Sequence, residues 1–158
     1  MNSDHPFWTF SLAVYAQPGV APECLALQDH DAIDVNILLF CAWLGASRCV
    51  LLRPTDLDRI TKSIETWTRD VVVPLRQARR AAKVQGQITL AKQIADTELA
   101  AEREAQDRLF ALSSSLPQAS HETAATCVRR NIELLLETRR DGKSPFPGAL
   151  EAAARTHA

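Results

Sequence analysis

The spacing of apolar residues is helical along most of the chain. Leucine, isoleucine, valine and alanine recur at three- and four-residue steps, which places them on one face of an α-helix, and no strand pattern interrupts these steps. The spacing predicts six helices, with a loose seventh over residues 149–155 as an alternative to disorder; the six begin near residues 4, 21, 31, 55, 87 and 120. We therefore expect an all-α fold, an irregular bundle of six to seven helices without a sheet.

The most hydrophobic segment lies at residues 37–52. From Val35 to Leu44 the helix is apolar on every side, which predicts one fully buried helix at the centre of the fold, with Asp31 as its N-cap. Gly45 and Arg48 interrupt the apolar run before it reaches the roughly 20 residues that a membrane span needs. The sequence therefore predicts a core helix and no membrane span.

The helical spacing of residues 57–82 continues through Pro74. Proline removes a backbone hydrogen bond and crowds the preceding turn, so we expect a kink near residues 70–74. The basic residues of this segment gather on the side opposite the apolar stripe, as on a solvated helix surface: Lys62, Arg69, Arg76, Arg80 and Lys83.

Two carboxylates interrupt the apolar stripe of the helix that begins near residue 87. Glu98 and Glu102 occupy positions where the spacing predicts burial, and a buried carboxylate needs a cation, a metal ion or hydrogen-bond donors. Arg79 flanks the apolar stripe of the preceding helix and is the best placed cation to meet them. We therefore expect the two glutamates in a structural ion-pair network between the two helices, in a ligand pocket, or at boundary positions that are exposed to solvent.

Asn36 is a further polar residue on an apolar helix face, and it must be hydrogen-bonded if it is buried. It either bonds to a neighbouring helix end or lines a polar pocket together with other polar side chains. The residues that we expect to form one site or one structural network are Gln28, Asp34, Asn36, Arg76, Arg79, Glu98 and Glu102.

The sequence contains no catalytic signature. None of the glutamates has a histidine three residues later, so the di-iron bundle pattern is missing, and no glycine-rich phosphate loop or nucleophile–base spacing is present. Asp29, Asp31 and Asp34 form an aspartate-rich stretch with His30, but it lies where a turn enters a helix, and capping accounts for two of the aspartates. We predict no catalytic residue, no metal ligand and no cofactor, and the sequence favours a protein that is not an enzyme.

Net charge and the arrangement of the cysteines indicate which partners and which cellular location to expect. With 158 residues, 46% of them apolar, and a formal net charge of −1, the chain lacks the basic excess that nucleic-acid binding normally requires. No C-x-x-C pair is present, and the N-terminal residues lack the basic segment of a secretory signal. We therefore expect reduced thiols, a cytoplasmic location and no nucleic-acid partner. Apolar neighbours place three of the four cysteines in the core: Cys24, Cys41 and Cys127.

One helical domain is expected over residues 1–140. Residues 141–158 are rich in proline and glycine, and Phe146 and Leu150 are their only large apolar side chains. Such a segment gains too little from burial to offset the entropy of ordering it. We expect this tail to be extended or mobile, or to be docked through Phe146 on its own chain or on a partner.

Four short motifs follow one another along the chain: W-x-x-x-L-x-x-Y from Trp8, C-L-x-L-Q from Cys24, D-V-N-x-L-L-F from Asp34 and P-L-R-x-x-R-R from Pro74. In this combination the sequence resembles a family of small proteobacterial proteins of unknown function, over about residues 7–110. The resemblance implies a soluble, all-helical bacterial protein. It implies no activity, substrate or cofactor, but its motifs include several of the polar residues above.

Two functions from different classes remain. The first hypothesis is a non-enzymatic interaction or adaptor protein that binds another protein, with the polar residues serving fold specificity. The alternative is a small-molecule binding protein or enzyme with an interhelical pocket lined by Gln28, Asp34, Asn36, Arg76 and Glu98. A solvent-connected cavity surrounded by at least three of these side chains would favour the alternative. The sequence leaves the oligomeric state open.

Overall fold

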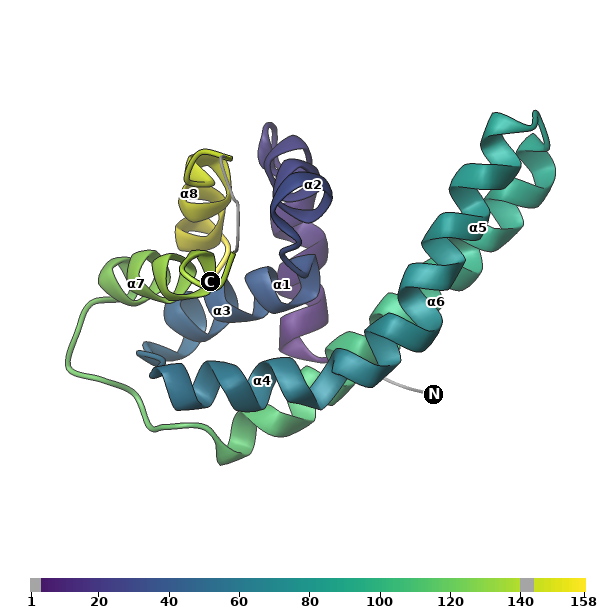
Figure 1. Ribbon diagram of the computed structural model, residues 1–158. Coiled ribbons are helices and arrows are strands. Elements are labelled where there is room, and N and C mark those ends of the chain that lie inside the picture. Colours follow the sequence, from purple (N-terminus) through teal and green to yellow (C-terminus); the bar gives the residue numbers. More distant parts are fainter. Residues whose placement is uncertain (1–3, 140–143) are drawn as a thin grey trace.

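The computed structural model describes residues 4–139 and 144–158, and these ranges contain helices and no strand (Figure 1). The α-helices are α1 (Pro6–Tyr15), α2 (Val20–Asp31), α3 (Val35–Arg48), α4 (Pro54–Trp67), α5 (Val73–Val84), α6 (Ile88–Leu112), α7 (Ala124–Leu136) and α8 (Gly148–Thr156). A π-helical turn, η1 (Thr68–Val72), joins α4 to α5, and a 3-10 turn, η2 (Ser113–Ser115), follows α6. α4, η1 and α5 are contiguous in sequence and form one continuous helix with a π-helical turn inside it. Counted in this way, the described residues form seven α-helices, and the predicted all-α bundle is confirmed.

Helix α3 lies at the centre of the bundle. Every residue from Asn36 to Ala46 is buried, and α1, α6, α7 and α8 all contact this helix. The prediction of one central buried helix is therefore confirmed. α3 has only 14 residues. Across the described ranges, no helix combines the length and the hydrophobicity that a membrane crossing requires.

The N-terminus of α3 is capped by Asp34, so the prediction of Asp31 as its cap is wrong. The Asp34 carboxylate accepts a hydrogen bond from the Asn36 backbone N–H at 2.8 Å. Asp31 is the last residue of α2, and its buried carboxylate accepts hydrogen bonds from Arg139 and from the Ser144 hydroxyl. Both aspartates precede the apolar run, and either suits a helix start, so the local pattern does not distinguish them.

Helix α7 approaches α3 closely at Gly45. A Cβ atom at this position would lie 2.6 Å from the backbone nitrogen of Val128, so only glycine fits. Near this contact, the buried Asn131 side chain accepts a hydrogen bond from the Leu52 N–H (2.9 Å) and donates one to the Val50 carbonyl (2.9 Å). These contacts fix α7 to α3 and to the loop that follows it.

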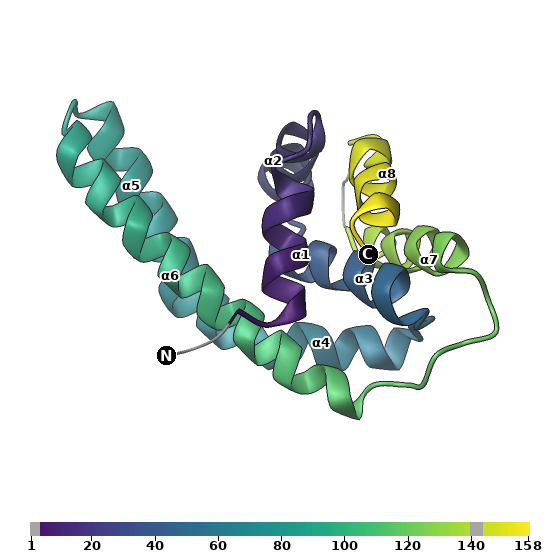
Figure 2. The same cartoon turned by 180° about the vertical axis from the view of Figure 1, so that it is seen from behind.

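Helices α5 and α6 form an antiparallel hairpin that projects from the bundle (Figures 1 and 2). We call α5 together with residues 88–99 of α6 the arm. The chain changes direction at η1, between α4 and the arm (Figure 1). Pro74 is the second residue of α5 and cannot donate a backbone hydrogen bond, so the regular α-helical pattern is interrupted where the sequence predicts it, in the form of a π-helical turn.

The C-terminal segment packs into the bundle as α8. Leu150 is fully buried, and Ala153 and Ala154 are buried beside it. Gly148–Thr156 is thus a helix packed on the bundle and not an extended segment; residues 141–143 of the predicted tail lie outside the described ranges.

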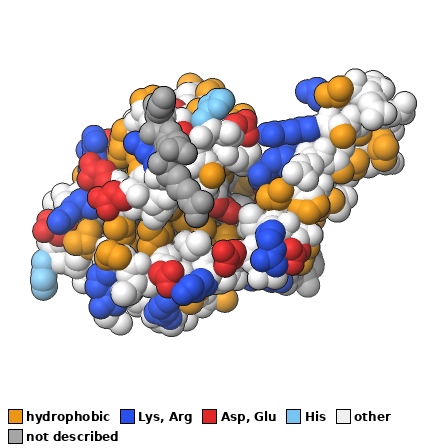
Figure 3. All heavy atoms as spheres, viewed as in Figure 1, with side chains coloured by type: hydrophobic (Ala, Val, Ile, Leu, Met, Phe, Trp, Pro, Cys, Tyr) orange, Lys and Arg blue, Asp and Glu red, His pale blue; other side chains and the backbone are white. Residues whose placement is uncertain are grey.

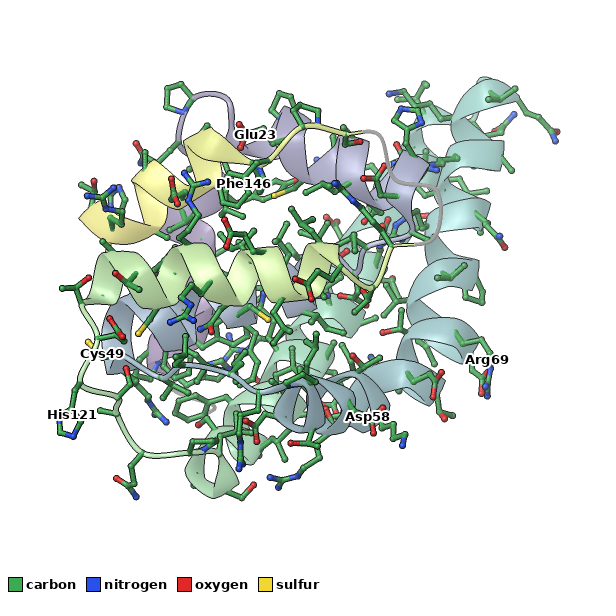
Figure 4. The ribbon with its side chains drawn as sticks, turned by 60° about the vertical axis from the view of Figure 1, so that its left-hand side comes forward. Glu23, Cys49, Asp58, Arg69, His121 and Phe146 are labelled. Carbon is green, nitrogen blue, oxygen red and sulfur yellow. The ribbon has the colours of Figure 1, made fainter. Side chains whose placement is uncertain are left out.

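Contacts from distant parts of the chain hold α8 in place. The Glu23 carboxylate on α2 accepts hydrogen bonds from the backbone N–H groups of Ala149 (2.9 Å) and Leu150 (3.0 Å), which are free donors at the start of α8. The Arg129 guanidinium lies 4.1 Å from the centre of the Phe146 ring. Figure 4 shows Glu23 and Phe146 close to the first turn of α8. A carboxylate at a helix N-terminus and a cation on an aromatic ring both stabilise the docked tail.

Candidate functional site

A cavity of about 530 Å³ opens to solvent where the arm meets the bundle. Its walls come from α1, α2, the start of α3, η1, α5 and α6. Figure 3 shows basic side chains gathered at this junction. All the polar residues that the sequence singles out line this one cavity: Gln28, Asp34, Asn36, Arg76, Arg79, Glu98 and Glu102. The structure thus brings the whole predicted set together.

An ion-pair cluster forms the arm side of the cavity. Arg79 donates hydrogen bonds to Glu98 through Nε and Nη2, and the Nε atom of Arg76 lies 3.5 Å from a Glu98 oxygen. The Glu98 side chain is only 9% exposed. The Nη2 atom of Arg76 also lies 3.5 Å from a carboxylate oxygen of Glu102. The prediction of a buried Glu98 paired with arginine from the preceding helix is confirmed.

Arg76 turns inward, although the helical spacing places it on the solvated side of its helix. Its side chain is 17% exposed, compared with 70% for Lys62 and 65% for Arg69. A π-helical turn inserts one extra residue into a helix, so a helical wheel drawn through residues 57–82 loses its phase beyond η1. The shift in phase moves Arg76 from the solvated side to the cavity.

Replacing Glu98 with alanine should lower the unfolding free energy by about 3 kcal/mol, because it strands Arg76 and Arg79 without their shared carboxylate. Urea denaturation of both proteins measures this loss. Glu104→Ala is the matched control, since Glu104 pairs with Arg108 at an exposed position and should cost less than about 0.5 kcal/mol. Equal losses in the two variants would show that the Glu98 cluster is not a buried network.

Asp34 and Glu102 are the carboxyls of the cavity whose charge is least compensated. Within the described residues, no arginine or lysine forms an ion pair with Asp34, which accepts bonds from backbone N–H groups of α3 and from the Thr68 hydroxyl (3.3 Å). Burial raises the pKa of Asp34. Burial also raises the pKa of Glu102, and the neighbouring charge of Glu98 raises it further. A cation that enters the cavity would therefore stabilise the ionised form of both carboxyls.

Two more buried polar side chains line the cavity without complete hydrogen bonding. Gln106 Nε2 donates to Asn36 Oδ1 (3.0 Å), which satisfies the predicted need of Asn36 for a partner. Within the described residues, Gln106 Oε1 and the Ser11 hydroxyl oxygen have no hydrogen-bond partner. Each residue is 3% exposed. The sequence analysis missed both residues, although Gln106 continues the four-residue steps from Glu98 and Glu102.

Apolar side chains from both the bundle and the arm also line the cavity. Leu12 on α1, Leu25 on α2 and Leu99 on α6 line the cavity, and their exposed fractions are 50%, 43% and 51%. Trp8 and Tyr15 extend this lining along α1. A single exposed leucine carries no signal in a sequence, because only the fold shows that three of them surround one opening.

The remaining reactive groups lie outside the cavity. Asp29 is exposed and pairs with Arg80 (3.0 Å), whereas Asp31 is buried, so the aspartates of this stretch do not converge on one point. In residues 4–139 and 144–158, no three His, Cys, Asp or Glu side chains come together as a metal site requires. Figure 4 places His121 in the loop before α7, far from the arm.

Three of the four cysteine thiols lie in the core. Cys24, Cys41 and Cys127 are buried, as predicted. Burial raises the pKa of Cys24 and of Cys41 to about 12, which keeps both as neutral thiols.

The fold and the site define the class as an all-helical protein with a mixed polar and apolar cavity between a projecting hairpin and a bundle. The chain belongs to the family described as "Protein of unknown function (DUF2390)", which matches residues 6–109. This range contains every residue that lines the cavity. No curated protein and no solved structure matches the chain.

Proposed function

We propose that this protein binds a small molecule in the cavity between the arm and the bundle. The proposal rests on one observation, which is that polar side chains from separate helices meet at one cavity. All the residues of the predicted pocket, which come from different helices, line one cavity that is open to solvent: Gln28, Asp34, Asn36, Arg76 and Glu98. A purely structural network has no need of such an opening.

The size and lining of the cavity support a small-molecule ligand. A volume of about 530 Å³ lies within the range of roughly 300–1,000 Å³ typical of small-molecule sites. Such sites combine apolar walls with a few polar groups, and this cavity is lined by Leu12, Leu25 and Leu99 together with the arginine–glutamate cluster. No histidine or cysteine is among its lining residues, so the proposal is binding, and no residue is assigned a catalytic role.

Filling the cavity should abolish binding while an equal substitution outside it should not. Leu99 and Leu90 lie on α6 with similar exposed fractions, 51% and 49%, but only Leu99 lines the cavity. We expect compounds from a metabolite library that raise the melting temperature of the unsubstituted protein to do the same for Leu90→Trp and to fail with Leu99→Trp. If Leu99→Trp retains every thermal shift, the ligand does not occupy this cavity.

A protein-interaction or adaptor role is the second candidate, and the arm is the observation that favours it. Its tip exposes three large apolar side chains, Val84 (88%), Ile88 (64%) and Leu90 (49%). A projecting hairpin with an apolar tip is suited to contact another protein. Ile88→Lys would then prevent partner capture and leave small-molecule binding intact, which separates the two functions.

A further inference from the structure

We infer that the ligand of the cavity carries a positive charge on an apolar body, as a protonated amine on an alkyl or aryl group does. This inference rests on the proposed binding function and adds the chemical class of the ligand to it.

The charges of the cavity point to a cation. Three carboxylates, Asp34, Glu98 and Glu102, line it together with two arginines, Arg76 and Arg79. The ionised cavity therefore carries one excess negative charge. A ligand ammonium group would compensate this excess negative charge.

The two arginines are already occupied, which argues against an anionic ligand. Arg79 directs two guanidinium N–H groups at Glu98, and Arg76 lies between Glu98 and Glu102. An anion would have to compete with these carboxylates for the same donors. A cation would instead find two carboxylates whose charge is not fully compensated. Asp34 accepts hydrogen bonds only from neutral donors, and Glu102 shares its one arginine with Glu98.

The unpartnered polar atoms also favour a ligand that donates hydrogen bonds. Gln106 Oε1 is an acceptor without a donor within the described part of the chain, and the Ser11 oxygen can accept as well. A protonated amine supplies up to three N–H donors. If the amides of Gln106 and Asn36 were both turned around, the unpartnered Gln106 atom would be an N–H donor, so the Ser11 oxygen is the acceptor that both orientations leave available.

The apolar side chains at the opening of the cavity indicate that the ligand also has an apolar group. Leu12, Leu25 and Leu99 expose apolar surface at one opening, and Trp8 and Tyr15 add aromatic rings. Covering these side chains removes apolar surface from water, which an alkyl or aryl group on the amine would do. The carboxylates and the leucines line the same cavity, so a single amphipathic cation can contact both.

Three probes of nearly equal size and shape test the charge. These are 2-phenylethylamine, 2-phenylethanol and phenylacetate, which are positive, neutral and negative at pH 7.5. We expect ligand-observed NMR titrations to show that the amine binds about tenfold more tightly than either of the other two probes. Glu102→Gln should weaken amine binding by about fivefold and leave 2-phenylethanol binding unchanged. Glu104→Gln, the same substitution on an exposed part of α6, should change neither.

The outcomes separate the inference from the function on which it rests. If 2-phenylethanol or phenylacetate binds as tightly as the amine, and Leu99→Trp prevents this binding, the cavity binds small molecules but is not selective for cations. If no probe binds and the metabolite library also produces no thermal shift, both the inference and the proposed function are wrong. If the amine binds best but Glu102→Gln and Glu104→Gln weaken it equally, the charge recognition does not come from Glu102.

Discussion

Truncating the chain after Arg139 should lower the unfolding free energy by about 5 kcal/mol and the melting temperature by about 10 to 20 °C. The truncation removes the fully buried Leu150 and the buried Ala153 and Ala154, and it exposes the bundle surface that they cover. It also leaves the Glu23 carboxylate without the N–H groups of α8. Circular dichroism during heating measures the change.

A truncation after Thr156 is the matched control. It removes only the two residues that follow α8, and it should shift the melting temperature by less than about 2 °C. If the longer truncation has an equally small effect, α8 contributes nothing to the core, and the tail behaves as the mobile segment that its composition suggests.

Gly45→Ala should destabilise the protein by about 4 kcal/mol, although alanine is normally the better helix former. The added Cβ would lie 2.6 Å from the Val128 backbone nitrogen and 2.8 Å from the Cys127 carbonyl carbon. A backbone cannot rotate away as a side chain can, so α3 and α7 must separate. Chemical denaturation gives the loss directly.

Gly148→Ala serves as the control for this substitution. Gly148 is the first residue of α8, and a Cβ there would meet nothing within 4 Å. The substitution should be neutral or stabilising by a few tenths of a kcal/mol. A neutral Gly45→Ala variant would contradict the close approach of α3 and α7.

Much of the fold and of the candidate site is predictable because the relevant signals are local. The all-round apolarity of residues 35–44 predicts the central helix, and the stripe that contains Glu98 predicts both its burial and its pairing with Arg79. Pro74 predicts the interruption of its helix, although not its π-helical form. Each of these predictions depends on helical period and on the cost of burying a charge.

The features that the sequence does not predict depend on contacts between distant segments. The position of α8 depends on Glu23 and Arg129, which are far from it in sequence. The roles of Ser11 and Gln106 appear only when α1 and α6 meet at the cavity. The helical wheel also places Arg76 wrongly, because one π-helical turn upstream changes the phase of the helix.

The central claim is that a small molecule binds between the arm and the bundle, and the three indole N–H signals test it most directly. Trp8 lines the cavity, Trp43 is buried in the core, and the Trp67 indole donates to the Ala101 carbonyl. In a titration of ¹⁵N-labelled protein with the tightest of the three phenyl probes, we predict that the Trp8 signal moves to saturation while the Trp43 and Trp67 signals stay in place. Trp8→Phe assigns the signal. A Trp8 signal that stays in place at saturating probe, or an equal shift of all three signals, would contradict the claim.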